Sequence, residues 1–201
     1  KYNHRYGKYF QMLIISQNLT NYDISLPNDA IFRINLAWVN SLDELSKLLK
    51  KHENQAVFLD LPRNRTKPPH NKYSFKEISE IIKKFSNVRY FAISNIDQPD
   101  DLNEYIELLS DDIVIVPKIE SHIGVKNIDK IISKIKNPQK IIMLDHDDLY
   151  TNLLKHNESP EKFSYYINNL SKFCKENNIE MLRTIGIIFA SETRDVTGYT
   201  K

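Results

Sequence analysis

The stretch Ile113-Val114-Ile115-Val116-Pro117-Lys118-Ile119-Glu120 joins an apolar run to two charged side chains. Residues 113–118 have the length and the β-branched composition of a strand that is buried on both faces, as the strands of parallel sheets are. Side chains two positions apart point to the same face of a strand, so Lys118 and Glu120 should lie together where this strand ends. The stretch therefore predicts a parallel sheet with charged groups at the end of a buried strand.

Seven further runs of the same kind occur along the chain, at residues 12–16, 30–36, 56–61, 88–94, 140–144, 180–183 and 186–190. The spacing leaves room for helices between most of these runs, and strands that alternate with helices predict a parallel α/β sheet. Eight such strands close a (β/α)8 TIM barrel, which is the fold class that we expect, with some helices shortened or missing. The connections 17–29 and 183–185 are too short for a full helix, so an open doubly wound sheet with fewer strands stays the alternative.

Helix starts are marked by capping residues between the predicted strands. Ser41 and Ser74 each precede a glutamate by three residues, Glu44 and Glu77, which is the pattern of a capping box. After Gly124, apolar residues at positions 125, 128, 132 and 135 recur at the spacing of one helix face. These patterns predict amphipathic helices that pack against the sheet.

The composition limits what such a protein can do. The 201 residues are 41% hydrophobic and 27% charged with a net charge of +2, and we expect one domain, residues 1–201, in the cytoplasm. The two signs of charge are interspersed and no apolar run reaches the length of a membrane span, so neither nucleic acid nor a membrane is expected as a partner. The single cysteine, Cys174, excludes an intrachain disulfide and a cysteine-based zinc site. Four scattered glycines exclude the glycine-rich loops that bind dinucleotides and nucleoside triphosphates.

Polar side chains gather where the predicted strands end, which is where parallel barrels carry their functional residues. They are Arg33, Asn35, Asp60, Ser94, Lys118, Glu120, Asp145, Asp148 and Thr184. Glu120 and Asp148 would end neighbouring strands, and two carboxylates with water molecules are a usual way of holding Mg²⁺. Lys118 could share this site as the cation that balances an anionic substrate. Asp148 by itself could equally cap a helix, and the sequence assigns no role to His146 or Trp38.

Several of these segments resemble the pyruvate kinase family. In chain order they are Phe32-Arg33-Ile34-Asn35-Leu36, Val57-Phe58-Leu59-Asp60-Leu61-Pro62, Tyr90-Phe91-Ala92-Ile93-Ser94, Pro117-Lys118-Ile119-Glu120 and Ser191-Glu192-Thr193. The resemblance runs from about residue 12 to residue 199. It implies a barrel that binds phosphoenolpyruvate or pyruvate, without the lid domain and the C-terminal domain of that family.

The resemblance also assigns catalytic and metal-binding roles. Lys118 would stabilise the oxygen of an enolate, Thr184 would lie near the face where the proton is transferred, and Arg33 would contact the substrate phosphate. Glu120 and Asp148 would ligate Mg²⁺ or Mn²⁺. Together with the metal, the lysine would neutralise the charge that develops on the enolate.

The substrate pocket and the monovalent-cation site match the family less completely. Asn35, Asp60 and Ser94 match positions that line the pocket, and Asn35 and Asp60 also match two of the family's K⁺ ligands. Two other K⁺ ligands, a serine and a threonine, are Ala37 and Leu61 here, so the K⁺ site is expected to be lost.

These departures shape the expected function. Without a lid there is little to clamp a nucleotide or to exclude water, so an ATP-forming pyruvate kinase is not expected. We expect a metal-dependent enzyme, a lyase or a transferase, that acts on pyruvate, phosphoenolpyruvate or a related 2-oxo acid through a Mg²⁺-bound enolate. The pattern around Glu120 and Asp148 is also similar to hydroxyacid–pyruvate aldolases and citrate lyase β-subunits, which have no lid. A non-catalytic relative that binds a metabolite or a partner stays the alternative, and the sequence leaves open whether the chain forms a homo-oligomer.

Overall fold

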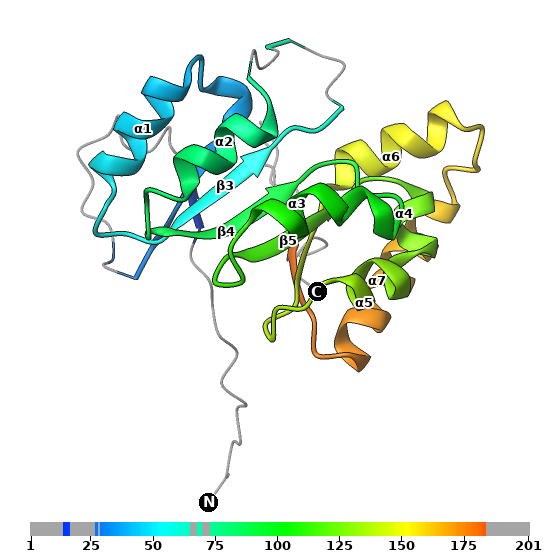
Figure 1. Ribbon diagram of the computed structural model, residues 1–201. Helices are drawn as coiled ribbons and strands as arrows, with labels where there is room; N and C mark the ends of the chain where they lie inside the picture. Colours follow the sequence, from blue (N-terminus) through cyan, green and yellow to red (C-terminus); the bar gives the residue numbers. More distant parts are fainter. Residues whose placement is uncertain (1–13, 17–26, 28, 65–67, 70–72, 184–201) are drawn as a thin grey trace, which may run out of the picture.

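The strands of the sheet follow the order of the chain (Figure 1). In the computed structural model, which describes residues 14–16, 27, 29–64, 68–69 and 73–183, each strand pairs in parallel with the next one along the chain. The strands are β1 (Ile14–Ser16), β2 (Ile31–Asn35), β3 (Val57–Leu61), β4 (Val88–Ile93), β5 (Val114–Ile119), β6 (Ile141–Leu144) and β7 (Glu180–Arg183). The register pairs Asn35 with Asp60 and Asp60 with Ala92, so the carboxyl ends of β2, β3 and β4 lie side by side.

The sheet curls into a half-barrel. The predicted α/β fold with parallel strands is confirmed, and seven of the eight apolar runs form its strands. The eighth run, residues 186–190, lies outside the described residues, so the described strands do not make up the closed (β/α)8 barrel that the count of runs predicts. The order of the described strands never reverses, which differs from the doubly wound alternative.

Helices connect the strands and cover the convex face of the sheet (Figure 1). They are η2 (Leu36–Trp38), α1 (Leu42–Lys51), α2 (Phe75–Ile82), η3 (Pro99–Leu102), α3 (Asn103–Leu108), α4 (His122–Lys126), α5 (Ile128–Lys134), α6 (His146–Lys155) and α7 (Lys162–Glu176), of which η2 and η3 are 3₁₀ helices. Both predicted helix starts are confirmed: Ser74 and Glu77 form a reciprocal capping box at α2, and at α1 the Ser41 Oγ accepts a hydrogen bond from Glu44 N. None of the helices in the described part of the chain is both long enough and apolar enough to cross a membrane.

Two apolar layers lie on the two faces of the sheet. The larger layer packs strand residues such as Ile34, Leu59 and Phe91 against the helices. The smaller layer fills the concave face and consists of Ile31, Phe58, Ala92, Val116, Ile141 and Met143. Side chains alternate between the two faces of a strand, so the position two residues further along β3, β4 and β5 faces the same side. These positions are Asp60, Ser94 and Lys118, which places a polar layer directly above the smaller apolar layer.

The segment after Gly124 differs from the single helix that its spacing predicts. Val125, Ile128, Ile132 and Ile135 are all buried, as expected for one apolar face. The chain nevertheless forms two helices, α4 and α5, which meet at Asn127. Asn127 Nδ2 donates a hydrogen bond of 2.9 Å to the carbonyl oxygen of Asp97, so the junction between the helices is tied to the loop after β4.

Candidate functional site

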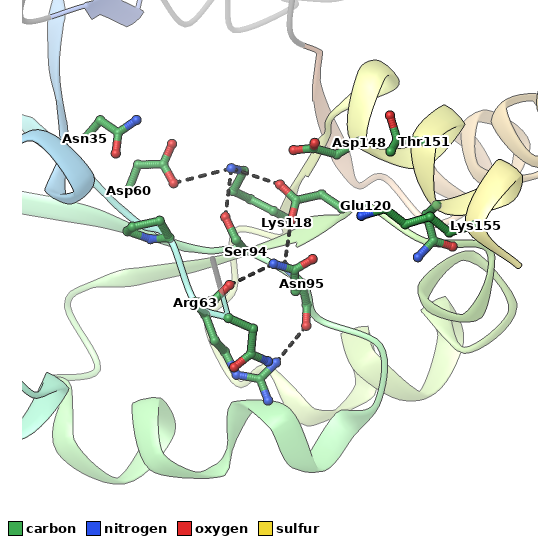
Figure 2. A pocket seen from close by; sticks show the side chains of 13 residues that line it. Asn35, Asp60, Arg63, Ser94, Asn95, Lys118, Glu120, Asp148, Thr151 and Lys155 are labelled. Atoms are coloured by element: carbon green, nitrogen blue, oxygen red, sulfur yellow. Dashed lines mark hydrogen bonds and ion pairs between the residues drawn. The ribbon is translucent and has the colours of Figure 1, made fainter. Parts of the chain in front are cut away.

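A polar cavity of about 220 Å³ lies at the carboxyl ends of the strands (Figure 2). Its walls come from β2, β3 and the end of β5, from the loops that follow β3 and β4, and from α6. It is lined by Asn35, Asp60, Pro62, Arg63, Asn64, Ser94, Asn95, Lys118, Glu120, Asp148, Thr151, Asn152 and Lys155. Six residues that the sequence places in the site, namely Asn35, Asp60, Ser94, Lys118, Glu120 and Asp148, are therefore brought together.

Lys118 lies at the centre of this group. Its side chain is buried, and its Nζ lies 2.9 Å from Ser94 Oγ, 3.0 Å from Glu120 Oε1 and 3.5 Å from Asp60 Oδ1 (Figure 2). Burial by itself would lower the pKa of this ammonium, but the carboxylates of Asp60 and Glu120 outweigh burial and hold the pKa above its usual value. Lys118 is therefore a fixed positive charge and not a neutral amine that could act as a nucleophile.

Glu120 is buried beside Lys118 at the end of β5. Its Oε2 accepts a hydrogen bond of 2.7 Å from the backbone N–H of Asn95. Its Oε1 forms the ion pair with Lys118 Nζ at 3.0 Å, and apart from this ion pair the buried oxygen has no hydrogen-bond donor among the described residues. Burial raises the pKa of the Glu120 carboxyl, Lys118 and the Asn95 N–H oppose this shift, and Asp148 adds to it.

Glu120 belongs to a cluster of three carboxylates. One oxygen each of Glu120, Asp145 and Asp148 lies within 4.8 Å of the others. Asp145 is the N-cap of α6, and its Oδ1 accepts a hydrogen bond of 3.2 Å from the backbone N–H of Asp148. The cap of the helix is thus Asp145, and Asp148 stands one turn into α6 at the wall of the cavity.

This donor set fits a divalent cation. Mg²⁺ and Mn²⁺ prefer carboxylate oxygens and keep several water or substrate ligands. Glu120 shares the positive charge of Lys118 with Asp60, and the negative charge of the nearby Asp148 disfavours the Glu120 carboxylate. A cation held by Glu120, Asp148 and Asp145 would relieve the repulsion among these three carboxylates.

Two of the expected catalytic residues are not placed at the cavity. Arg33 is not one of its lining residues, and its guanidinium pairs with Asp60, with Nε 3.2 Å from Asp60 Oδ2 and Nη2 also in contact with that oxygen. Thr184 lies outside the described residues. Of the two residues without an assigned role, Trp38 is 59% exposed, and the ring of His146 packs edge-on against Phe163 at 6.4 Å.

Several lining residues were not predicted from the sequence. Thr151, Asn152 and Lys155 follow Asp148 by three, four and seven residues, which is the spacing of one helix face, so this signal could have found them. Arg63 and Asn95 belong to loops 32 residues apart that bind each other, Arg63 Nη1 donating to Asn95 O and Asn95 Nδ2 to Arg63 O, both at 2.7 Å. No sequence pattern indicates such a pairing.

Comparisons with known proteins show the fold and no more. No family model matches the chain, and no curated protein matches it. Among the solved structures, one similar chain is RipC from Yersinia pestis, with a TM-score of 0.60 and 15% sequence identity over 93% of this chain and 79% of that chain.

The predicted membership of the pyruvate kinase family is therefore wrong, because the fold matches RipC and no family model supports the short motifs. Those motifs have a general physical origin. A buried strand of a parallel sheet is an apolar run, and it commonly ends in a polar residue where it reaches solvent or a site. Phe58-Leu59-Asp60 and Val116-Pro117-Lys118 satisfy this rule, whatever the family.

Proposed function

We propose that the protein is an enzyme that requires a divalent cation, Mg²⁺ or Mn²⁺, and acts on a small 2-oxo acid through an enolate. The observation that supports this proposal most strongly is the cluster of Glu120, Asp145 and Asp148 beside the buried ammonium of Lys118. A bound divalent cation would act as a Lewis acid toward the oxygens of the substrate. Neither feature depends on membership of a particular family.

The size and polarity of the cavity support a small anionic substrate. A volume of about 220 Å³ is below the range of pockets for drug-sized ligands, which begins at roughly 300 Å³. Pyruvate, phosphoenolpyruvate and related 2-oxo acids are of suitable size, and their carboxylate and keto oxygens can share one metal ion.

Lys118 would stabilise the negative charge that develops on the enolate oxygen. Its charge is held in place by Ser94, Asp60 and Glu120, so little reorganisation is needed when the substrate charge appears. Because its pKa is raised, Lys118 keeps its proton and acts by electrostatics. This role is the same whether the enzyme is a lyase that breaks or forms a carbon–carbon bond or a transferase that uses phosphoenolpyruvate.

The buried free thiol of Cys174 supports a cytoplasmic location.

The experiment that tests the proposal compares Mn²⁺ binding by calorimetry in the wild type, Glu120→Gln and Asp147→Asn. Losing a ligand should weaken Mn²⁺ binding by at least about tenfold, since changes beside a metal ligand already cost that much. Asp147 is exposed on α6 next to Asp148 but is not part of the three-carboxylate cluster, so its variant should bind as the wild type does.

Oxalate, a mimic of enolpyruvate, completes the test. The wild type should bind oxalate when Mn²⁺ is present and not after chelation. Asp148→Asn serves as a second ligand variant if Glu120→Gln unfolds, because Asp148 is exposed and contributes little to the core. Equal Mn²⁺ affinity in the wild type and in Asp148→Asn would refute the metal site, and Mn²⁺ binding without oxalate binding would refute the enolate chemistry.

A further inference from the structure

One wall of the cavity carries hydrogen-bond donors and no acidic group. This wall, which we call the donor wall, lies on the last two turns of α6 and consists of Thr151, Asn152 and Lys155. We propose that the donor wall binds a second anionic group of the substrate, a carboxylate at the end remote from the 2-oxo acid. This inference rests on the proposed function, because it takes the 2-oxo acid end to be held at Glu120 and Asp148.

Lys155 is the lining cation that has no ion-pair partner in the described part of the chain. Among the three cationic lining residues, Arg63 Nη2 pairs with Asp101 Oδ1 at 2.7 Å, and Lys118 pairs with Asp60 and Glu120. Lys155 makes no ion pair with any residue that the structure describes, and its side chain reaches into the cavity from α6 (Figure 2). An anion that enters the cavity would therefore find one uncompensated positive charge, at Lys155.

Asn152 offers donors to the same ligand. Its Oδ1 lies 3.0 Å from Nδ1 of His122, which must donate there because an amide oxygen only accepts. This hydrogen bond uses the amide oxygen, so the NH₂ group of Asn152 is left to bind a ligand. The NH₂ group has no partner among the described residues. The Thr151 hydroxyl likewise has none. A carboxylate accepts hydrogen bonds only, so this set of donors suits it.

The geometry of α6 connects the donor wall with the metal cluster. Asp148 and Lys155 are seven residues apart, which is two turns and about 10 Å along the helix axis. Helical side chains lean toward the N-terminus, so the Lys155 ammonium is carried back toward Asp148. A substrate of a few carbon atoms can therefore contact both groups.

The charge of Lys155 is needed because the helix itself does not favour an anion there. Lys155 is the last residue of α6, and the C-terminal end of a helix carries a partial negative charge. Removing the ammonium would leave this end unfavourable to a carboxylate. The preference for a second carboxylate should then disappear and not merely weaken.

The test compares two ligands that differ only in that group. Both 2-oxoglutarate and 2-oxopentanoate have five carbon atoms, and the second has a methyl group in place of the terminal carboxylate. With Mn²⁺ present, calorimetry on the wild type should show 2-oxoglutarate binding at least about tenfold more tightly. In Lys155→Met the two ligands should bind within about twofold of each other, whereas Lys155→Arg should keep the preference. Lys175→Met, which removes an exposed lysine of α7 outside the cavity, is the matched control and should behave as the wild type.

The outcomes separate this inference from the proposed function. If the wild type binds oxalate with Mn²⁺ but does not prefer 2-oxoglutarate, the donor wall binds no carboxylate and only this inference is overturned. The same holds if Lys155→Met keeps the preference, because Lys155 is then a solvated helix residue. If the wild type binds neither Mn²⁺ nor oxalate, both proposals fail. Unchanged Mn²⁺ affinity and melting temperature in Lys155→Met would show that the loss of preference is not a loss of the metal site or of the fold.

Discussion

At the scale of single residues, the site is organised around charges that are buried in pairs. Asp60 is almost inaccessible and faces two cations, Arg33 and Lys118. Lys118 in turn lies between Asp60 and Glu120, so each buried charge has a neighbour of opposite sign. Burying an isolated charge is costly, and removing one partner of such a network leaves the other uncompensated. This coupling fixes the position of the Lys118 ammonium and of the Glu120 carboxylate before a substrate binds.

Arg63 should control metal binding although it touches no carboxylate of the cluster. Its guanidinium bonds Asn95 O and Asp101 Oδ1, both at 2.7 Å, and Asn95 N donates to Glu120 Oε2 at 2.7 Å. A lysine has one nitrogen in place of the two that make these bonds, so Arg63→Lys should loosen Asn95 and weaken Mn²⁺ binding by about tenfold.

Calorimetry and circular dichroism check this prediction together. The helix content of Arg63→Lys should match that of the wild type, and Arg89→Lys, at an exposed position of β4, should bind Mn²⁺ as the wild type does. Wild-type Mn²⁺ affinity in Arg63→Lys would mean that the loops hold Asn95 without the arginine.

At the scale of secondary structure elements, local signals predict the strands and helix starts, and distant contacts decide the rest. The strand that ends at Lys118 and the capping box at Ser74 follow from residues adjacent in sequence. The same strand ends predict that Lys118, Glu120 and Asp148 meet. The junction at Asn127 depends on a carbonyl group 30 residues away, and the approach of Arg63 to Asn95 joins two loops. Neither contact leaves a pattern in the sequence.

Gly124 is a second point where α4 depends on a distant loop. A Cβ at this position would lie 2.7 Å from the carbonyl oxygen of Ile96, a backbone atom that cannot rotate away. Alanine normally stabilises a helix by about 1 kcal/mol relative to glycine, but overpacking a close contact costs about 1–3 kcal/mol. Gly124→Ala should therefore lower the free energy of unfolding in urea, whereas Lys130→Ala on the exposed side of α5 should leave it nearly unchanged. A more stable Gly124→Ala would show that α4 can move away from the loop after β4.

At the scale of the whole molecule, the chain-order sheet explains why the site forms where it does. All the described strands run in the same direction, so residues from β2, β3 and β5, from the loops after β3 and β4, and from α6 converge on one cavity. The apolar layer on the concave face closes the cavity from below. The convergence of these residues could be predicted from the positions of the strand ends. Membership of a particular protein family could not be predicted from them, because strand ends of this kind are common to parallel sheets.

The same packed core makes the folded state sensitive to high pH. Burial raises the pKa of the Cys174 thiol from 9.0, and those of the Tyr73 and Tyr105 hydroxyls from 10.0, to about 12 each. Below about pH 8 all three groups are protonated in the folded and unfolded states, so their contribution to stability is constant. Between pH 9 and pH 12 the unfolded chain loses these protons first, which favours unfolding. The free energy of unfolding in urea should therefore be flat from pH 7 to 8 and fall increasingly from pH 9 to 11. Cys174→Ala should reduce the slope that begins near pH 9, whatever its effect on the stability at pH 8. A wild-type stability that stays constant up to pH 11 would contradict the burial of these three groups.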